Sequence, residues 1–240
     1  MRADKIRRLL ILFLACSLLL QAWAFASTDL TETPATRYIA LTFDDGPSGS
    51  ITEALLQVLE KHQVPATFFL CGYRIRQYPQ LVGEIAQGGH ELGIHGYTHE
   101  YLNTKTQAQV RDELIQSVSA IAEITGEAPV LFRPPGGLIS DAVKKECQDL
   151  GLPIVLWSID PEDWCCTSAS TVVSRVVPKA KDGSIILMHD LCHSSVEAAD
   201  AIISLLKQQG YVFLTVSQLA QAKCSTLEPG ERYFKINFVQ

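Results

Sequence analysis

The chain has 240 residues, a net charge of −6 and 47% hydrophobic residues. A chain of this length can bury one good hydrophobic core. It contains no basic block and no basic stripe rich in aromatic residues, so nucleic acid is excluded as an expected partner, and long-range attraction would not draw in an anionic polymer.

The N-terminal segment is organised like an export signal. Residues 1–8 carry four basic side chains and one acidic one, and residues 9–26 are almost wholly apolar and close on Ala24-Phe25-Ala26. A basic start, an apolar middle and an Ala-x-Ala ending are typical of a secretory signal cleaved after Ala26. An uncleaved membrane tether is the alternative, because this apolar run approaches the roughly 20 residues that span a bilayer. Both forms predict a secreted or cell-surface protein.

Residues 27–36, which bear Thr, Ser and Pro, form a short leader to a domain expected over residues 37–222. In that domain, short apolar runs alternate with stretches of helical spacing. The expected strands cover residues 38–43, 66–70, 91–94, 130–132, 153–159, 184–188 and 211–214. The expected helices lie near residues 50–62, 78–87, 106–125, 139–150, 169–180 and 195–209. This alternation predicts a parallel α/β fold, but the pattern does not separate a closed barrel from an open sheet.

The C-terminal extension, residues 223–240, follows a last expected helix at 218–223. The alternation of residues 233–238 predicts one added strand packed beside the domain.

Two adjacent carboxylates, Asp44 and Asp45, end the first expected strand within the stretch Thr42–Pro47. Burying two like charges together is costly unless a cation or a base compensates them, because each raises the pKa of the other. The pair can divide the work of a metal-dependent hydrolase, with one carboxylate binding the metal and the other moving a proton. A solvated turn is the alternative, since Asp, Gly and Pro all favour turns.

Two histidines, His95 and His99, follow the third expected strand. On one helical turn, imidazoles four positions apart face the same way, and with one Asp oxygen they supply three metal ligands and leave positions open for water. This is the layout of a hydrolytic metal site. Surface or core histidines are the alternative, and Gly96 weakens the expected helix.

Further polar residues also fall at or just past the carboxyl ends of expected strands. They are Arg133, Asp160 to Asp163 and His189. In barrels and open parallel sheets alike, functional groups from distant parts of the chain converge at this edge.

Five motifs in chain order contain these residues and resemble those of the polysaccharide deacetylase family, also described as NodB homology or carbohydrate esterase family 4. The motifs are Thr42–Pro47, His95–His99, Arg133–Gly137, Asp160–Trp164 and Leu187–His189. The similarity covers about residues 37–220. It implies an irregular (β/α)₇ barrel.

The resemblance also implies a role for each motif. Asp45, His95 and His99 look like the metal ligands, with Zn²⁺ the first choice and Co²⁺ or another divalent ion as alternatives. Asp44 resembles the general base that takes a proton from the attacking water. Seen singly, each of these residues would have a simpler explanation as a surface or core residue.

The remaining implied roles concern the base, the acid and the substrate. Arg133 matches the arginine that pairs with the base. His189 looks like the general acid that protonates the departing amine, and Asp163 like the carboxylate that orients it and keeps it cationic. Trp164 and Leu187 resemble the apolar walls that receive the acetyl methyl group.

Two glycines depart from the family pattern. Gly136 stands where an aromatic residue is usual, so it keeps the backbone N–H expected to bind the oxyanion but loses the ring, which puts a sugar-stacking surface in doubt. Gly96 stands where a small hydroxyl residue is common, and we expect looser support around the metal. Glu113 falls on an expected outer helix face and needs no function.

Six cysteines follow Ala26, an even number that permits disulfides in an exported chain. The specific expectation is a bridge between Cys165 or Cys166 and Cys192, which would join the loops after Asp163 and His189.

Together, these features predict a secreted, metal-dependent hydrolase that removes acetyl groups from an N-acetylated polysaccharide, either peptidoglycan or a chitin-type oligosaccharide. The reaction would cleave an amide carbon–nitrogen bond, and the protein is expected to be a monomer. An O-acetyl esterase acting on a xylan-like polymer is one alternative. A glycan-binding module of the same fold that has lost its chemistry is another.

Overall fold

A parallel sheet built around strand β1 (Arg37–Asp44) is the centre of the computed structural model, which describes residues 36–238. β1 pairs with β2 (Thr67–Leu70), β5 (Ile185–His189) and β6 (Tyr211–Leu214), and β2 pairs with β3 (Glu91–Ile94). The strands read as nearly continuous apolar runs because helices cover the sheet. In this register Asp44 lies opposite His189.

The sheet closes through single-residue bridges. Phe132 bridges Ile94 on one side and Ile154 on the other, and Ile159 bridges Ile186 of β5. The expected strand at 130–132 is therefore a bridge, and that at 153–159 shrinks to β4 (Ile154–Val155). The fold is the expected irregular (β/α)₇ barrel. Its strands pair continuously around β1, whereas single-residue bridges close the opposite side.

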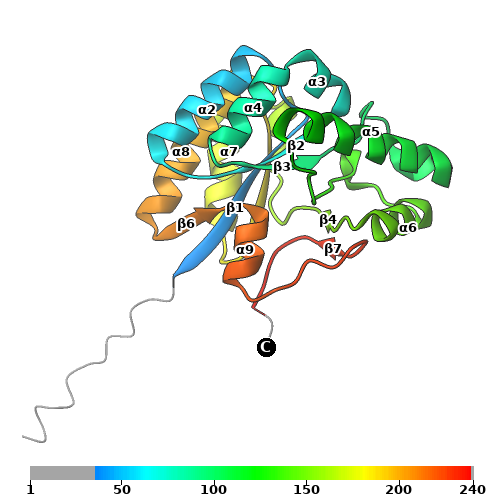
Figure 1. The fold of residues 1–240 in the computed structure, drawn as a ribbon. Helices are drawn as coiled ribbons and strands as arrows, with labels where there is room; N and C mark the ends of the chain where they lie inside the picture. The colour runs from blue at the N-terminus through cyan, green and yellow to red at the C-terminus, as the bar shows by residue number, and fades with distance from the viewer. Residues whose placement is uncertain (1–35, 239–240) are drawn as a thin grey trace, which may run out of the picture. The chain divides into compact units, whose positions relative to one another are not determined.

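Helices lie on the outside of the strands, with α2, α7 and α8 on one side of β1 and α5 and α6 on the other (Figure 1). Their bounds are α2 Ser50–His62, α3 Gly72–Gln77, α4 Pro79–Gln87, α5 Gln107–Thr125, α6 Asp141–Leu150, α7 Ala169–Val176, α8 His193–Gln208 and α9 Val216–Ala222. Most begin within two residues of the expected positions. α3 was not expected, because only Gly72 and Ile75 of this short helix are buried and they show no periodicity.

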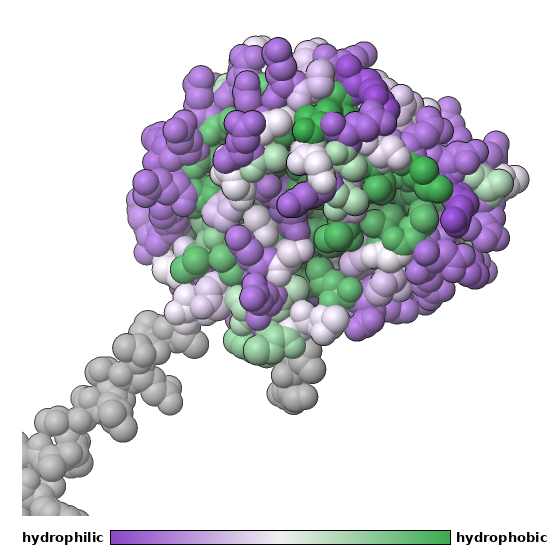
Figure 2. Space-filling view, viewed as in Figure 1, coloured by the Kyte–Doolittle hydropathy of each residue, from purple (hydrophilic) through white to green (hydrophobic). Residues whose placement is uncertain are grey.

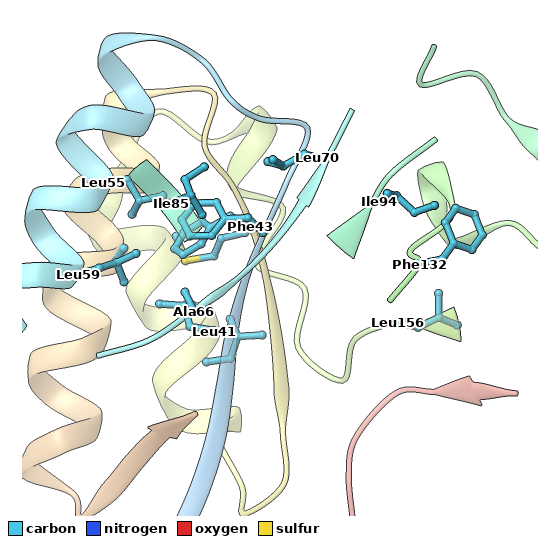
Figure 3. Packing of buried hydrophobic residues seen from close by; sticks show 14 of the residues in the cluster. Leu41, Phe43, Leu55, Leu59, Ala66, Leu70, Ile85, Ile94, Phe132 and Leu156 are labelled. Carbon is cyan, nitrogen blue, oxygen red and sulfur yellow. The ribbon is translucent and has the colours of Figure 1, made fainter. Parts of the chain in front are cut away.

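Local signals explain where the longest helix begins and ends. Thr106 and Gln109 form a capping box at the start of α5, and Gly126 ends it in the left-handed conformation. The core beneath the helices is continuous: Figure 3 shows Leu55 and Leu59 of α2 directed toward Phe43 of β1, while Ile94 and Phe132 pack together elsewhere in the same cluster.

The C-terminal segment contributes β7 (Arg232–Tyr233), which pairs in parallel with β4. Figure 2 shows apolar side chains gathered over the side where α5 and α6 lie. Ile115 of α5 and Leu150 of α6, together with Val130, line a cleft of about 230 Å³. Val130 precedes the Phe132 bridge, so this cleft lies toward the amino ends of the strands and not at the edge that carries Asp44.

The expected signal or tether, residues 1–26, lies outside the described residues. Between residues 36 and 238, no helix has both the length and the apolar character needed to cross a membrane.

Candidate active site

The carboxyl end of β1 places Asp44 against Arg133. Arg133 Nη1 donates to Asp44 Oδ1 at 2.7 Å, and both side chains are almost completely buried. The other guanidinium nitrogens donate to two backbone carbonyls at and just after β4, both at 3.0 Å, and the group lies 4.1 Å from the centre of the Phe69 ring. Burial lowers the pKa of Arg133, and the charge of Asp44 opposes this. The pair is therefore a fixed cation holding a fixed carboxylate.

Asp45, His95 and His99 bring three potential metal ligands together. One ligand atom from each lies within 4.8 Å of the others. Asp45 Oδ1 is 2.9 Å from His99 Nε2 and 3.3 Å from His95 Nε2. Burial raises the pKa of the Asp45 carboxyl, but the two adjacent imidazoles lower it more strongly, well below its ordinary range. The carboxylate is thus held in the charged form that binds a cation.

The geometry of these three residues fits a metal ion better than mutual hydrogen bonds. Asp45 Oδ1 is buried and has no hydrogen-bond partner among residues 36–238, although both imidazole nitrogens are close to it. One carboxylate oxygen and two imidazole nitrogens form a donor set suited to a divalent transition metal. Asp45, His95 and His99 therefore fit the divalent metal ion that the first two motifs imply.

The reason for the convergence of the two histidines differs from the one expected. Residues 95–100 form a loop rather than a helical turn. Gly96 and His99 have positive φ values of 76° and 64°, as does Asp45 at 74°, so the backbone itself turns the ligands toward one another. At Gly96 this conformation favours glycine over a hydroxyl residue.

A carboxylate on helix α5 supports this loop. Glu113 Oε2 accepts hydrogen bonds from the backbone N–H groups of Tyr97 and Thr98 at 2.7 and 2.9 Å, and Oε1 accepts one from Thr98 Oγ1 at 2.7 Å. The expectation that Glu113 lies on an outer face without a role is wrong, because its carboxylate is buried against the loop that carries both imidazoles. Glu113 follows the buried Val110 by three residues, so helical spacing places it on the inward side of α5.

His189 ends β5 beside Asp163, as expected. His189 Nδ1 lies 2.8 Å from Asp163 Oδ1, and Asp163 Oδ2 accepts from the His189 N–H and from Ser195 Oγ at 2.9 and 2.6 Å. Burial lowers the pKa of His189, but the hydrogen bond to Asp163 and the charges of Asp44 and Asp45 outweigh it and raise the pKa to about 9. His189 therefore holds a proton at neutral pH, and its Nε2 is left to donate it.

Comparison with known proteins agrees with the five motifs. The family model for polysaccharide deacetylase matches residues 31–155, just over half of the chain. A peptidoglycan-N-acetylglucosamine deacetylase of Bacillus cereus is 38% identical over 192 residues, which are 78% of this chain and 90% of the relative. The chain belongs to the polysaccharide deacetylase family.

Other members differ in length and in their named substrates. The peptidoglycan-N-acetylglucosamine deacetylase PgdA of Listeria monocytogenes is 37% identical over 212 residues, 87% of this chain but only 44% of the relative, so the chain spans less than half of that protein. A family 4 acetyl xylan esterase from Clostridium thermocellum, solved with a cobalt ion, is 30% identical with a TM-score of 0.79, covering 83% of this chain and 99% of that one.

In this family member, the glycine of the first motif has a packing reason. A Cβ atom at Gly46 would lie 2.2 Å from the carboxylate of Asp190, the residue after His189. Asp190 Oδ2 accepts from Thr52 Oγ1 at 2.5 Å, and burial raises the Asp190 pKa to about 7. The segment that follows β1 and the segment that follows β5 are therefore closely packed against each other.

The third motif of this family member exposes its backbone. Gly136 has φ 64°, and a Cβ atom there would lie 3.0 Å from Tyr101 Cε1. The aromatic ring of Tyr101 therefore lies where a side chain at position 136 would begin. The sequence motifs did not point to Tyr101.

Of the two residues expected to form apolar walls, Leu187 is buried on the same face of β5 as His189, whereas Trp164 is 64% exposed.

The expected disulfide is not formed. All six cysteines of the described part of the chain are free thiols. Ser194 lies between the two loops: its Oγ donates to the Cys166 carbonyl at 3.0 Å and is 3.2 Å from Cys192 Sγ. Hydrogen bonds through Ser194, in place of a bridge, connect the loop of Asp163 to the loop of His189.

Proposed function

We propose that this chain is a metal-dependent hydrolase that removes acetyl groups from N-acetylated glycans, with peptidoglycan or a chitin-type oligosaccharide as the substrate. One observation carries the proposal: a buried carboxylate–arginine pair and an imidazole–carboxylate pair flank three convergent metal-ligand atoms. The names of the Bacillus cereus and Listeria monocytogenes relatives support peptidoglycan as the polymer.

The proposed metal ligands are Asp45, His95 and His99, with Zn²⁺ the first choice for this donor set and Co²⁺ the alternative. When bound, a divalent ion at such a site acidifies water and polarises the acyl oxygen. His95 suits this role because its Nδ1 lies 2.7 Å from the Arg133 carbonyl oxygen, which fixes the ring and leaves Nε2 for the ion.

The remaining steps belong to the side chains around the ligands. Asp44 takes a proton from the attacking water, while Arg133 keeps its carboxylate aimed. His189 Nε2 then gives its proton to the departing amine, because an amine leaves as the neutral species far more readily than as an anion. Asp163 holds the imidazole cationic until that transfer.

Two further features serve the acyl group in this proposal. The Gly136 N–H donates to the oxyanion, as an exposed backbone donor at a fixed turn can do without reorganisation. Leu187 and Trp164 line the space for the acetyl methyl group.

We further propose that residues 1–26 direct export or tether the protein, that residues 27–36 are a leader, and that the catalytic domain spans residues 37–222 with residues 223–240 as an extension. The apolar N-terminal run and the cell-wall substrates in the relatives' names support a secreted or cell-surface location.

The test is acetate release from N-acetylglucosamine oligomers by residues 27–240, with added Zn²⁺, with a chelator, and with Asp44→Asn. We expect release that requires the metal and falls by about 10²- to 10⁴-fold in Asp44→Asn, because the general base is lost. Release from acetylated xylan in place of N-acetylated oligomers would establish the esterase alternative. Metal-loaded protein that releases acetate from neither polymer would refute both, and glycan binding that survives chelation would then indicate a binding module.

A further inference from the structure

An exposed aromatic ring lies at the edge of the metal-ligand loop. Tyr101 follows His99 by two residues, and 57% of its surface is exposed. Its ring occupies the space where a side chain at Gly136 would begin, since a Cβ there would lie 3.0, 3.6 and 3.7 Å from Tyr101 Cε1, Cδ1 and Cζ. The ring thus lies beside the backbone whose N–H is proposed to bind the oxyanion.

The backbone under this ring is well anchored. Leu102, the next residue, is completely buried in the core, so the chain turns outward at Tyr101 for a structural reason. Thr104 Oγ1 donates to the Tyr101 carbonyl at 3.1 Å. Glu100 and Lys105 form an ion pair across the same short turn. The backbone that carries Tyr101 is therefore anchored, while its aromatic ring stays in contact with water.

A second exposed aromatic, Trp164, directly follows Asp163, the partner of His189. Tyr101 is close in sequence to the metal ligand His99, and Trp164 is next to Asp163, whose carboxylate holds His189. Sugar rings present polar edges and faces of C–H groups, and the electron-rich face of an aromatic ring attracts such C–H groups. Binding sites usually combine this kind of apolar surface with a few placed polar groups.

We propose that Tyr101 is a substrate-binding residue that stacks on a sugar ring of the glycan chain next to the acetyl group being removed. This inference rests on the proposed function and deepens it, because it makes the enzyme selective for acetyl groups carried on a sugar chain over small acetyl compounds. Gly136 is the complementary half of the arrangement, since a side chain at that position would displace the ring.

The experiment compares Tyr101→Ala, Tyr101→Phe and wild type on two substrates: an N-acetylglucosamine tetramer and p-nitrophenyl acetate, an acetyl ester without a sugar. In Tyr101→Ala we expect the ratio of kcat/KM for the tetramer to kcat/KM for the ester to fall about tenfold, mainly through KM, which corresponds to about 1.4 kcal/mol. Tyr101→Phe keeps the ring and should restore the ratio to within about twofold.

Phe234→Ala is the matched control. Phe234 is similarly exposed at 53%, but the neighbouring Lys235 bridges Ser184 at the amino end of β5, at the opposite edge from His189. This variant should leave the ratio unchanged.

The outcomes separate this inference from the function it rests on. If wild type releases no acetate from any glycan, the proposed function fails. If wild type is active and Tyr101→Ala lowers both substrates equally, Tyr101 only supports the metal loop and the stacking role is refuted. An unchanged ratio in Tyr101→Ala refutes it as well, while leaving the deacetylase proposal intact.

Discussion

His95, which is buried, and His189, which is half-buried, lie at the same edge of one barrel, and their Nδ1 atoms face different acceptors. Each follows the carboxyl end of a strand and has its Nδ1 atom engaged. His95 Nδ1 lies 2.7 Å from the carbonyl oxygen of Arg133, whereas His189 Nδ1 lies 2.8 Å from the carboxylate of Asp163. A neutral carbonyl fixes a tautomer without favouring a charge, but a carboxylate stabilises the imidazolium.

Under the proposed function, this difference gives His95 and His189 opposite tasks. An imidazole backed by a carbonyl can offer its Nε2 lone pair to a metal ion. An imidazole backed by a buried carboxylate retains a proton that it can donate. The role is therefore set by the acceptor behind the ring, which comes from a different part of the chain in each case.

The largest expected effects come from removing each ring in turn. His95→Ala should abolish tight metal binding, and acetate release with it. His189→Ala should reduce acetate release by about 10²- to 10⁴-fold while the protein still binds its metal, because only the acid is lost. Metal content after equilibrium dialysis, measured beside activity, distinguishes the two, and His193→Ala at an exposed position is the control. Loss of metal from His189→Ala would contradict this division of roles.

A smaller effect is expected when the partner of His189 is changed. The pKa of His189 is raised from 6.5 to about 9, so its stabilising interaction with Asp163 is fully present below pH 6.5 and is lost as the pH rises through 9. In Asp163→Asn we expect this pKa to fall toward 6.5, the alkaline limb of kcat/KM to move to lower pH, and activity at pH 8 to fall by about 30-fold, because the protonated fraction of His189 falls by that factor.

NMR titration of His189 in chelator-treated protein measures that pKa directly, away from any bound metal. Ser195→Ala provides a milder comparison, because Ser195 Oγ bonds the same carboxylate without touching the imidazole. A His189 pKa that stays near 9 in Asp163→Asn would show that Asp44 and Asp45 hold the proton instead.

The smallest effect concerns the support of the metal loop. Glu113→Gln replaces one acceptor oxygen with an NH₂ group facing donors of Tyr97 and Thr98, so we expect metal affinity to fall by about 10- to 100-fold with the pKa of His189 unchanged. Metal affinity can be measured by competition with a coloured chelator. Glu123→Gln is the matched control on the same helix, since Glu123 is exposed and, among residues 36–238, pairs only with Arg76. Equal losses in both variants would remove the positioning role from Glu113.

The sequence by itself determined the order of elements and the identity of the chemical groups. Apolar runs and helical spacing are local properties, so they placed β3, β6 and α2 at the observed bounds. Strand-end motifs also carried the candidate residues, because in a parallel α/β fold the carboxyl ends of distant strands must meet. Two side-chain pairings follow from that rule together with the family resemblance: Asp44 with Arg133, and His189 with Asp163.

The tertiary structure alone decided how those groups are held. It showed that His95 and His99 meet through positive φ angles and not a helical turn, and that Glu113 binds their loop. It also placed the Tyr101 ring over Gly136 and left the expected cysteine bridge unformed. Each of these depends on a contact between segments far apart in sequence, or on a backbone angle that the fold imposes, and neither leaves a periodic signal in the chain.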